Sequence, residues 1–96
     1  MTDEESRLER DVARAASARQ VLDNVVYQEA FAKIEATIIA RWKGSDAQDV
    51  DTRERAFSEL RLLHAVRGYL QDAINGGKVA EDRLSFLERL KNGLHF

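Results

Sequence analysis

One stripe of large apolar residues constrains this chain more than any other feature of its sequence. The stripe advances by four, three, four and four residues and consists of Tyr27, Phe31, Ile34, Ile38 and Trp42. On a helical wheel these positions fall within an arc of about 80°. In a strand, where side chains alternate between two faces, the same residues would not share one side. The stripe therefore predicts an amphipathic helix over residues 24–43, with Asp23 or Asn24 as its N-cap.

Helix-ending residues divide the rest of the chain into few segments. Proline is absent, and glycine occurs only at positions 44, 68, 76, 77 and 93. Proline breaks helices, and a glycine just past the last turn ends them. We therefore expect a helical chain whose helices end at Gly44, at Gly76-Gly77 and at Gly93.

The first segment predicts a helix over residues 3–22. Thr2 and Glu5 have the spacing of a capping box, so Thr2 is the expected N-cap. The apolar face of this helix is thin and holds Leu8, Val12, Ala15 and Ala16. Because isolated helices of this length are marginal in water, the helix is expected to form against another surface.

The third helix carries the broadest apolar surface of the chain. Asp51 is its expected N-cap, with Glu54 at the reciprocal position of a capping box. Its stripe consists of Ala56, Leu60, Leu63, Val66, Leu70, Ala73 and Ile74. Leu62 and Tyr69 widen the stripe to about half of the circumference, which is typical of a helix with two neighbours.

These segments predict an all-α fold, a small bundle of three to four helices in which the fourth spans 79–92. The second and third helices are expected to pair as a central antiparallel helical hairpin. We expect a single domain over 1–96, with an N-terminal helix at 1–22, a core at 24–92 and a tail at 93–96. The centre of the predicted core consists of Phe31, Ile34, Ile38, Leu60, Leu63 and Leu70.

Charge and residue usage argue against several classes of protein. The 15 basic and 17 acidic residues give a net charge of −2, whereas duplex-binding domains usually carry a basic excess. Nucleic acid is therefore not the expected main ligand. There is no cysteine, and no apolar run approaches the ~20 residues of a membrane span. The first five residues lack the basic and apolar parts of a signal peptide, so we expect an intracellular protein without a membrane partner.

Catalytic and metal-binding patterns are missing from the sequence. The two histidines, His64 and His95, are 31 positions apart and belong to no metal-ligand motif. Ser58 precedes His64 by six residues, which places the two side chains on different faces of one helix. We expect no enzyme activity, no metal and no cofactor.

Two residues of the apolar stripes have more than one interpretation. Arg67 projects into the apolar face of the third helix, where it either extends its charge to solvent, pairs with Glu29 or Glu35, or binds a ligand. Trp42 ends the aromatic stripe just before Gly44, so it is either a lid on the core or a binding residue.

Both ends of the chain are candidate partner-binding segments. The thin stripe of Leu8, Val12 and Ala15 suits a helix that binds a partner or a second copy. The tail places bulky apolar side chains after Gly93 and consists of Leu94, His95 and Phe96. Apolar ends are uncommon unless they dock onto something. The alternative is that both ends fold back onto the core of this chain.

Three arginines on the first helix offer a DNA-binding alternative. Arg7, Arg10 and Arg14 recur at three- and four-residue spacing, where phosphates could accept hydrogen bonds from them. Acidic residues are interleaved with these arginines at Asp3, Glu4, Glu9 and Asp11. A solvated helix with internal ion pairs accounts better for this pattern.

Six segments between residues 18 and 80 carry a resemblance to a known group of proteins. They read ARQVLDN at 18–24, QEAF at 28–31, IIARWK at 38–43, TRERAF at 52–57, VRGYL at 66–70 and INGGKVA at 74–80. Together they resemble small helical proteins of tailed bacteriophages and prophages that are encoded among the head, portal and terminase genes. No activity is assigned to that group, so no residue role is carried over to this chain.

The resemblance implies a non-enzymatic structural or assembly protein of a phage. Its expected partners are other phage proteins, such as portal, capsid or packaging components, and it is a candidate homo-oligomer. Its expected location is the host cytoplasm or the virion. An accessory DNA-packaging protein that contacts DNA through the arginines of the first helix is the first alternative. A small inhibitor of a host protein is the second.

Overall fold

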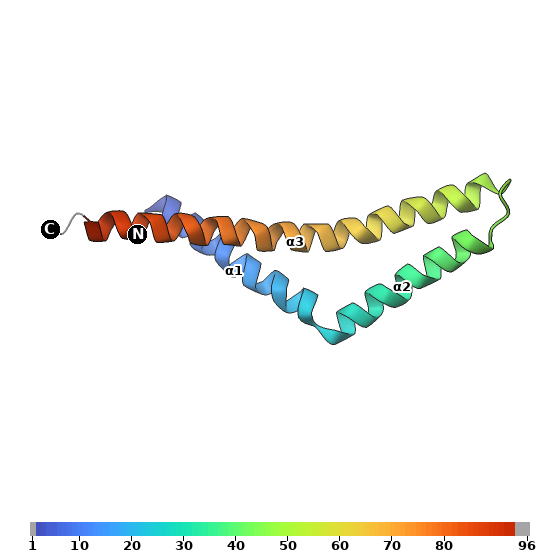
Figure 1. Cartoon of the computed structure of the whole chain (residues 1–96), viewed down its shortest axis with the longest axis horizontal. Helices are drawn as coiled ribbons and strands as arrows, with labels where there is room; N and C mark the ends of the chain where they lie inside the picture. The colour runs from blue at the N-terminus through green and yellow to red at the C-terminus, as the bar shows by residue number, and fades with distance from the viewer. Residues whose placement is uncertain (1, 94–96) are drawn as a thin grey trace. The chain divides into compact units, whose positions relative to one another are not determined.

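The computed structural model describes residues 2–93, which form three α-helices (Figure 1). These are α1 (Asp3–Asp23), α2 (Val25–Gly44) and α3 (Val50–Gly93), and the residues described contain no strand. The all-α prediction is therefore confirmed. None of these helices is both long enough and apolar enough to span a bilayer.

The helices divide into two compact units. Leu22–Tyr69 forms one, which we call the central unit, and Met1–Val21 with Leu70–Phe96 forms the other, which we call the terminal unit. Each unit pairs two helical segments, instead of gathering three or four helices around one core as the sequence predicted. The buried apolar side chains are correspondingly few and are Ala15, Ala18, Phe31, Ile38, Ala56 and Ala80.

The first two helices begin where the sequence predicts. The Thr2 Oγ1 atom accepts a hydrogen bond from the backbone N–H of Glu5 at 3.1 Å, so Thr2 caps α1. The Asn24 Oδ1 atom accepts one from the backbone N–H of Tyr27 at 3.0 Å, so Asn24 rather than Asp23 caps α2. Asn24 has extended backbone angles, which separate α1 from α2 by a single residue.

The start of α3 differs from the prediction. Its N-terminal cap is Asp49, whose carboxylate accepts a hydrogen bond from the backbone N–H of Thr52 at 3.2 Å. The pair Asp51 and Glu54 has the same spacing, but the turn closes earlier because the Asp49 N–H already bonds the Asp46 carbonyl at 3.0 Å. Asp51 lies instead in the first turn, where its negative charge complements the helix dipole.

The predicted helix end at Gly76-Gly77 is wrong. Helix α3 continues through both glycines to Gly93, so the expected third and fourth helices are one helix of 44 residues. No glycine among the described residues has a positive φ, so neither one adopts the left-handed conformation of a helix stop. Gly77 is buried in the terminal unit, and a Cβ built on it would overlap the side chain of Ala15. Its lack of a side chain lets α1 approach α3 closely.

Small residues and ion pairs hold the terminal unit together. Ala15, Ala18 and Ala80 are buried where α1 packs against the C-terminal part of α3. At the start of α1, Glu4 accepts a hydrogen bond from Arg83 at 3.0 Å, and Glu5 accepts one from Lys91 at 2.9 Å. The Lys91 hydrogen bond is the main cause that holds the pKa of Glu5 below its ordinary value. Ala15, further along α1, lies against Gly77, whereas Glu4 at the start of α1 pairs with Arg83, so the two segments run antiparallel.

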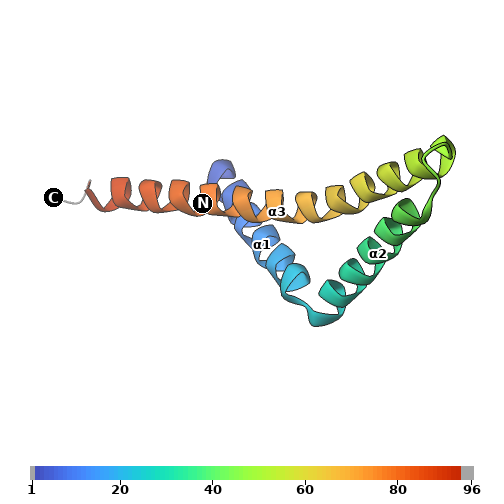
Figure 2. The ribbon, with the colours of Figure 1, turned by 45° about the vertical axis from the view of Figure 1, so that its right-hand side comes forward.

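The central unit is an antiparallel pair of α2 and the N-terminal part of α3 (Figure 2). Its cross-helix pairs are Arg41 with Glu59, Glu35 with His64, and Phe31 with Arg67. Phe31, Ile38 and Ala56 are buried between the segments. The rest of the predicted core centre is less enclosed: Leu60, Leu63 and Leu70 are half-buried, and Ile34 is 48% exposed. Ile34 is therefore not a core residue, because two helices cannot surround it.

Candidate protein-interaction surface

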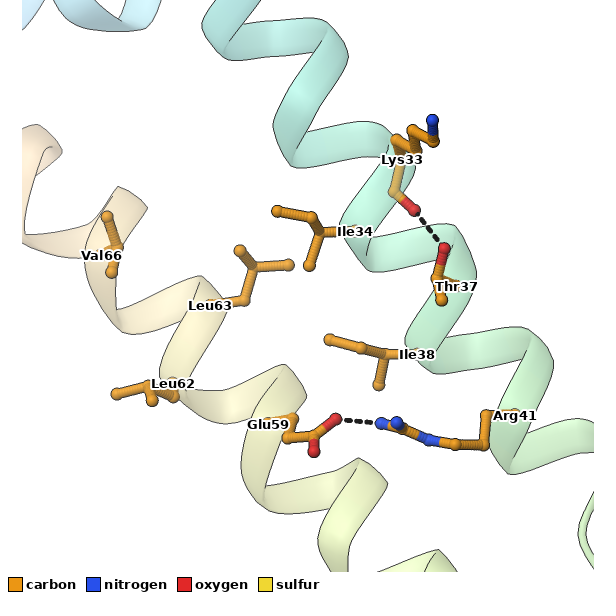
Figure 3. Close-up of a pocket in the computed structure, with 9 residues that line it drawn as sticks. All are labelled: Lys33, Ile34, Thr37, Ile38, Arg41, Glu59, Leu62, Leu63 and Val66. Atoms are coloured by element: carbon orange, nitrogen blue, oxygen red, sulfur yellow. Dashed lines mark hydrogen bonds and ion pairs between the residues drawn. The ribbon is translucent and has the colours of Figure 1, made fainter.

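The central unit carries an open apolar groove on one side of its helix pair (Figure 3). The groove has a volume of about 590 Å³. It is lined by Lys33, Ile34, Thr37, Ile38 and Arg41 of α2 and by Glu59, Leu62, Leu63 and Val66 of α3. We call this side the Leu62 face. Its residues recur every three or four positions, so each helix presents one continuous ridge.

Side chains at the floor of the groove contact each other, whereas those on its rim are exposed to solvent. Ile34 and Leu63 point toward each other between the helices, with Ile38 beside them (Figure 3). On the rim, Leu62 is 69% exposed and Val66 is 50% exposed. Both belong to the stripe that half-encircles α3, and the central unit covers only one side of that stripe. The Leu62 face is therefore an exposed apolar surface of the central unit.

Polar groups on the Leu62 face are largely satisfied within the chain. Arg41 and Glu59 form an ion pair across the groove (Figure 3). The hydroxyl of Thr37 donates a hydrogen bond to the Lys33 carbonyl at 2.8 Å, which leaves its methyl group available for apolar contact. The groove therefore offers shape and apolar surface rather than a set of converging polar groups.

The opposite side of the helix pair is also apolar, and cations lie over two of its aromatic rings. A smaller hollow of about 340 Å³ is lined by Ile38, Ile39, Trp42, Ala56, Phe57 and Leu60, and we call this side the Trp42 face. The guanidinium of Arg53 lies 5.2 Å from the centre of the Trp42 ring, and that of Arg61 lies 5.7 Å from the centre of the Phe57 ring. Such cation–π contacts place a charged group over each ring. The Trp42 face therefore combines exposed aromatic rings with charged groups.

A bridge between Glu35 and His64 joins the helices on the same side. His64 Nε2 is hydrogen-bonded to the Glu35 carboxylate. His64 lies one turn after Leu60 and two turns after Phe57, which places it beside the Trp42 face. Its ring also stacks on Phe31, with centroids 6.0 Å apart and 13° between the planes. The Glu35–His64 bridge and the His64–Phe31 stack thus lie beside the Trp42 face, whereas the Arg41–Glu59 ion pair lies on the Leu62 face.

Arg67 rests on an aromatic ring rather than on an acid. Its guanidinium lies 3.5 Å from the centre of the Phe31 ring, while its side chain remains exposed. Of the two predicted acidic partners, Glu35 is bonded to His64 instead. Arg67 therefore lies over Phe31, the most central aromatic residue of the apolar stripe. Its charge reaches solvent, which is one of the interpretations that the sequence left open.

The structure separates the residues that the sequence proposed for partner binding. Ala15 is buried against Gly77, and Leu8 and Val12 are half-buried. These three residues of α1 therefore pack within the terminal unit, whereas Ala16 of the same stripe is exposed. Trp42 is 43% exposed beneath Arg53. The proposed tail residues Leu94, His95 and Phe96 lie outside the described residues.

The chemistry available to small ligands is limited in the part of the chain that the structure describes. No group of three or more histidine, cysteine, aspartate or glutamate side chains is placed to hold a metal ion between residues 2 and 93. A hollow in the terminal unit is lined by Glu9, Val12, Glu81, Leu84, Ser85 and Glu88, whose acidic groups would repel anions. Arg7, Arg10 and Arg14, which the sequence offered for phosphate contacts, are exposed on α1.

Sequence reasoning missed the Leu62 face as a site, although one signal pointed toward it. The apolar stripe of α3 is wide enough for two neighbours, and the sequence assigned both to this chain. In the central unit only α2 packs on it, which leaves Leu62 and Val66 exposed.

Comparison of the chain with known protein families, with curated proteins and with solved structures found no match.

Proposed function

We propose that this chain is a non-enzymatic helical interaction module whose Leu62 face binds protein. The supporting observation is the contrast between two sides of one helix pair. Leu62 and Val66 are exposed on the Leu62 face, whereas on the Trp42 face a guanidinium lies over each of the exposed rings of Trp42 and Phe57. An exposed apolar groove is typical of a surface that is covered in use.

The character of the groove favours a protein over other ligands. Small-molecule sites enclose most of the ligand and fix it by a few convergent polar groups, and here the Arg41 and Glu59 charges neutralise each other. Nucleic acid requires unpaired cations along its phosphates, and Lys33 is the lysine that lines the groove. An amphipathic helix that places apolar residues every three or four positions fits the two parallel ridges.

Tailed-phage assembly is the biological setting that we propose for this module. The support is the resemblance of the segments between residues 18 and 80 to small phage proteins encoded among head, portal and terminase genes. In that setting the partners are portal, capsid or packaging proteins, and the module acts in the host cytoplasm or in the virion. Its role there is to join other proteins rather than to carry out a reaction.

A matched pair of substitutions tests the function. Leu62→Glu and Phe57→Glu both place a charge at an exposed position of α3, at 69% and 61% exposure, but on opposite faces of the helix pair. Epitope-tagged chains are expressed during infection, and their recovery with purified particles or with portal, capsid and packaging proteins is measured. We expect the wild type and Phe57→Glu to be recovered and Leu62→Glu to be lost. Equal recovery of both variants contradicts the proposal.

DNA binding gives a different result in a parallel measurement. An accessory packaging protein that contacts phosphates binds duplex DNA with an affinity that falls steeply with salt. Substituting Arg7 and Arg10 with alanine would then abolish binding, and Leu62→Glu would leave it unchanged. That outcome would replace the proposed function by the DNA-packaging alternative.

A further inference from the structure

We infer that the partner covering the Leu62 face is a second copy of this chain. The inference rests on the proposed function, because it identifies an occupant of the same surface. Two central units pack through their Leu62 faces into a four-helix bundle. The twofold axis runs parallel to the helices, so that α2 of one copy lies on α3 of the other.

The first argument is the number of helices needed to enclose a core. In the central unit only Phe31, Ile38 and Ala56 are buried, and none of the largest side chains is fully enclosed. A second pair of helices placed on the groove would surround Ile34 and Leu63 on all sides. Four is the number of helices in a common closed bundle, and two identical hairpins supply it by the most frequent symmetry of soluble oligomers.

The second argument is area. Five large apolar side chains lie on or beside the groove at 48 to 70% exposure, and they are Val26, Ile34, Leu62, Val66 and Tyr69. Val26 and Tyr69 extend the two ridges by helical spacing from Ile34 and Val66. Together these residues expose on the order of 600 Å² of surface, most of it apolar. A stable interface covers about 800 Å² on each partner, so one face of this size accounts for most of a dimer contact.

The third argument is charge, which selects the arrangement of the two copies. On the Leu62 face the α2 ridge carries the cations Lys33 and Arg41, and the α3 ridge carries Glu59 at the level of Arg41. A twofold axis parallel to the helices places equivalent residues of the two copies at the same height along the bundle. It also places α2 of each copy against α3 of the other. Each Arg41 then lies near two Glu59 carboxylates, one from each copy. An axis perpendicular to the helices would instead place the two cationic α2 ridges together.

Mass measurement in solution tests whether the second copy binds. The full chain is analysed by light scattering from about 1 to about 100 µM, a range that spans moderate affinities. We expect about 21.8 kDa, twice the 10.9 kDa of one chain. Leu62→Glu should weaken self-association at least ~100-fold, because a charge at the centre of an interface is desolvated. Phe57→Glu should retain the dimer, and circular dichroism checks that both variants keep their helices.

Cross-linking tests the arrangement, because the chain has no cysteine of its own. One sample carries Thr37→Cys and another carries Leu62→Cys, and the two are mixed and oxidised. Residues 37 and 62 lie at similar levels on opposite ridges, so the proposed axis brings Thr37 of one copy near Leu62 of the other. Mixed disulfides should therefore form faster than disulfides within either sample alone. Faster formation of the identical pairs overturns the arrangement.

Failure of this inference is distinguishable from failure of the proposed function. A chain that remains at 10.9 kDa throughout the concentration series has no second copy on its Leu62 face. If Leu62→Glu nevertheless abolishes recovery with phage proteins, the face binds a different protein and the proposed function stands. A dimer that survives Leu62→Glu shows that the copies meet elsewhere, which overturns the inference.

Discussion

The methyl group of Ala15 occupies the space where a side chain at position 77 would begin. The same position lies 3.2 Å from the carbonyl oxygen of Asp11, so a Cβ there would meet backbone as well as side chain. Backbone atoms of α1 cannot move aside without displacing the helix. Gly77 therefore determines how closely α1 and α3 pack in the terminal unit.

Neighbouring glycines of α3 should respond in opposite ways to alanine. Gly77→Ala forces α1 away from α3 and should destabilise the fold by about 1–3 kcal/mol, as over-packing commonly does. Gly76→Ala meets nothing within 4 Å and should stabilise the fold by about 1 kcal/mol, because alanine favours helix over glycine. Urea unfolding followed by circular dichroism measures both. Loss of stability in both variants would instead support a helix stop at these positions.

Removing the cap between α1 and α2 should weaken the start of α2. The Asn24 side chain satisfies the backbone N–H of Tyr27, and Asn24→Ala leaves that donor without its side-chain acceptor. The expected loss is about 1 kcal/mol in the free energy of unfolding. Asn24→Asp keeps an acceptor oxygen and serves as the control, which should retain most of the stability. The melting temperatures of the wild type, Asn24→Ala and Asn24→Asp measure this contribution. Equal melting temperatures would exclude a capping role for Asn24.

Two isoleucines one turn apart should differ strongly in their contribution to stability. Ile38→Ala removes a buried side chain and should cost about 2–5 kcal/mol. Ile34→Ala removes a side chain that is half-exposed in the single chain and should cost less than half as much when the protein is monomeric. Denaturant titrations in the Leu62→Glu background keep self-association out of the comparison. Similar costs at both positions would mean that Ile34 is enclosed in the monomer.

Acid should weaken the N-terminus of α3 through Asp49. Hydrogen bonds from the Thr52 hydroxyl and the Thr52 backbone N–H lower the pKa of Asp49 in the folded chain. A lowered folded-state pKa gives stability that is present above the unfolded pKa and is lost as the pH falls through the folded value. Stability should therefore decline below about pH 4, the ordinary range of an aspartate.

The variant Asp49→Asn isolates this contribution. Asparagine retains an acceptor oxygen for the Thr52 N–H but has no carboxyl group to protonate. Its melting temperature should fall less between pH 5 and pH 3 than that of the wild type. Glu5 contributes to the same acid transition, since Lys91 lowers its pKa, and the double variant with Glu5→Gln should flatten the profile further. An unchanged profile in both variants would assign acid sensitivity to other groups.

Local chemistry made much of the fold predictable. Thr2 and Asn24 cap their helices because a short oxygen-bearing side chain precedes an apolar helical pattern by the right spacing. The error at Asp49 arose because two aspartates had equivalent spacing, and only the turn geometry distinguishes them. The error at Gly77 arose because a glycine that ends a helix and one that admits a neighbouring helix look alike in sequence.

The candidate surface was less predictable because it depends on which side of a helix remains uncovered. The wheel places Leu62 and Tyr69 on the apolar arc of α3 but does not say whether this chain supplies their neighbour. The helical wheel also cannot show that Arg61 lies over Phe57 or that Arg67 lies over Phe31, because long side chains can adopt many rotamers. These rotamers depend on tertiary contacts, which the sequence pattern does not contain.

The unbroken course of α3 through Asn75-Gly76 has a consequence for the chemical ageing of the protein. Asparagine followed by glycine readily loses ammonia when the glycine nitrogen can attack the side-chain carbonyl, and that attack requires a backbone bend that a helix forbids. Here both residues are helical, and the Asn75 Oδ1 atom accepts a hydrogen bond from Gln71 at 3.2 Å. Deamidation at Asn75 should therefore occur only when the middle of α3 opens transiently. The rate at which its mass gain accumulates in a stored sample, followed by mass spectrometry without any label, reports how often that opening occurs.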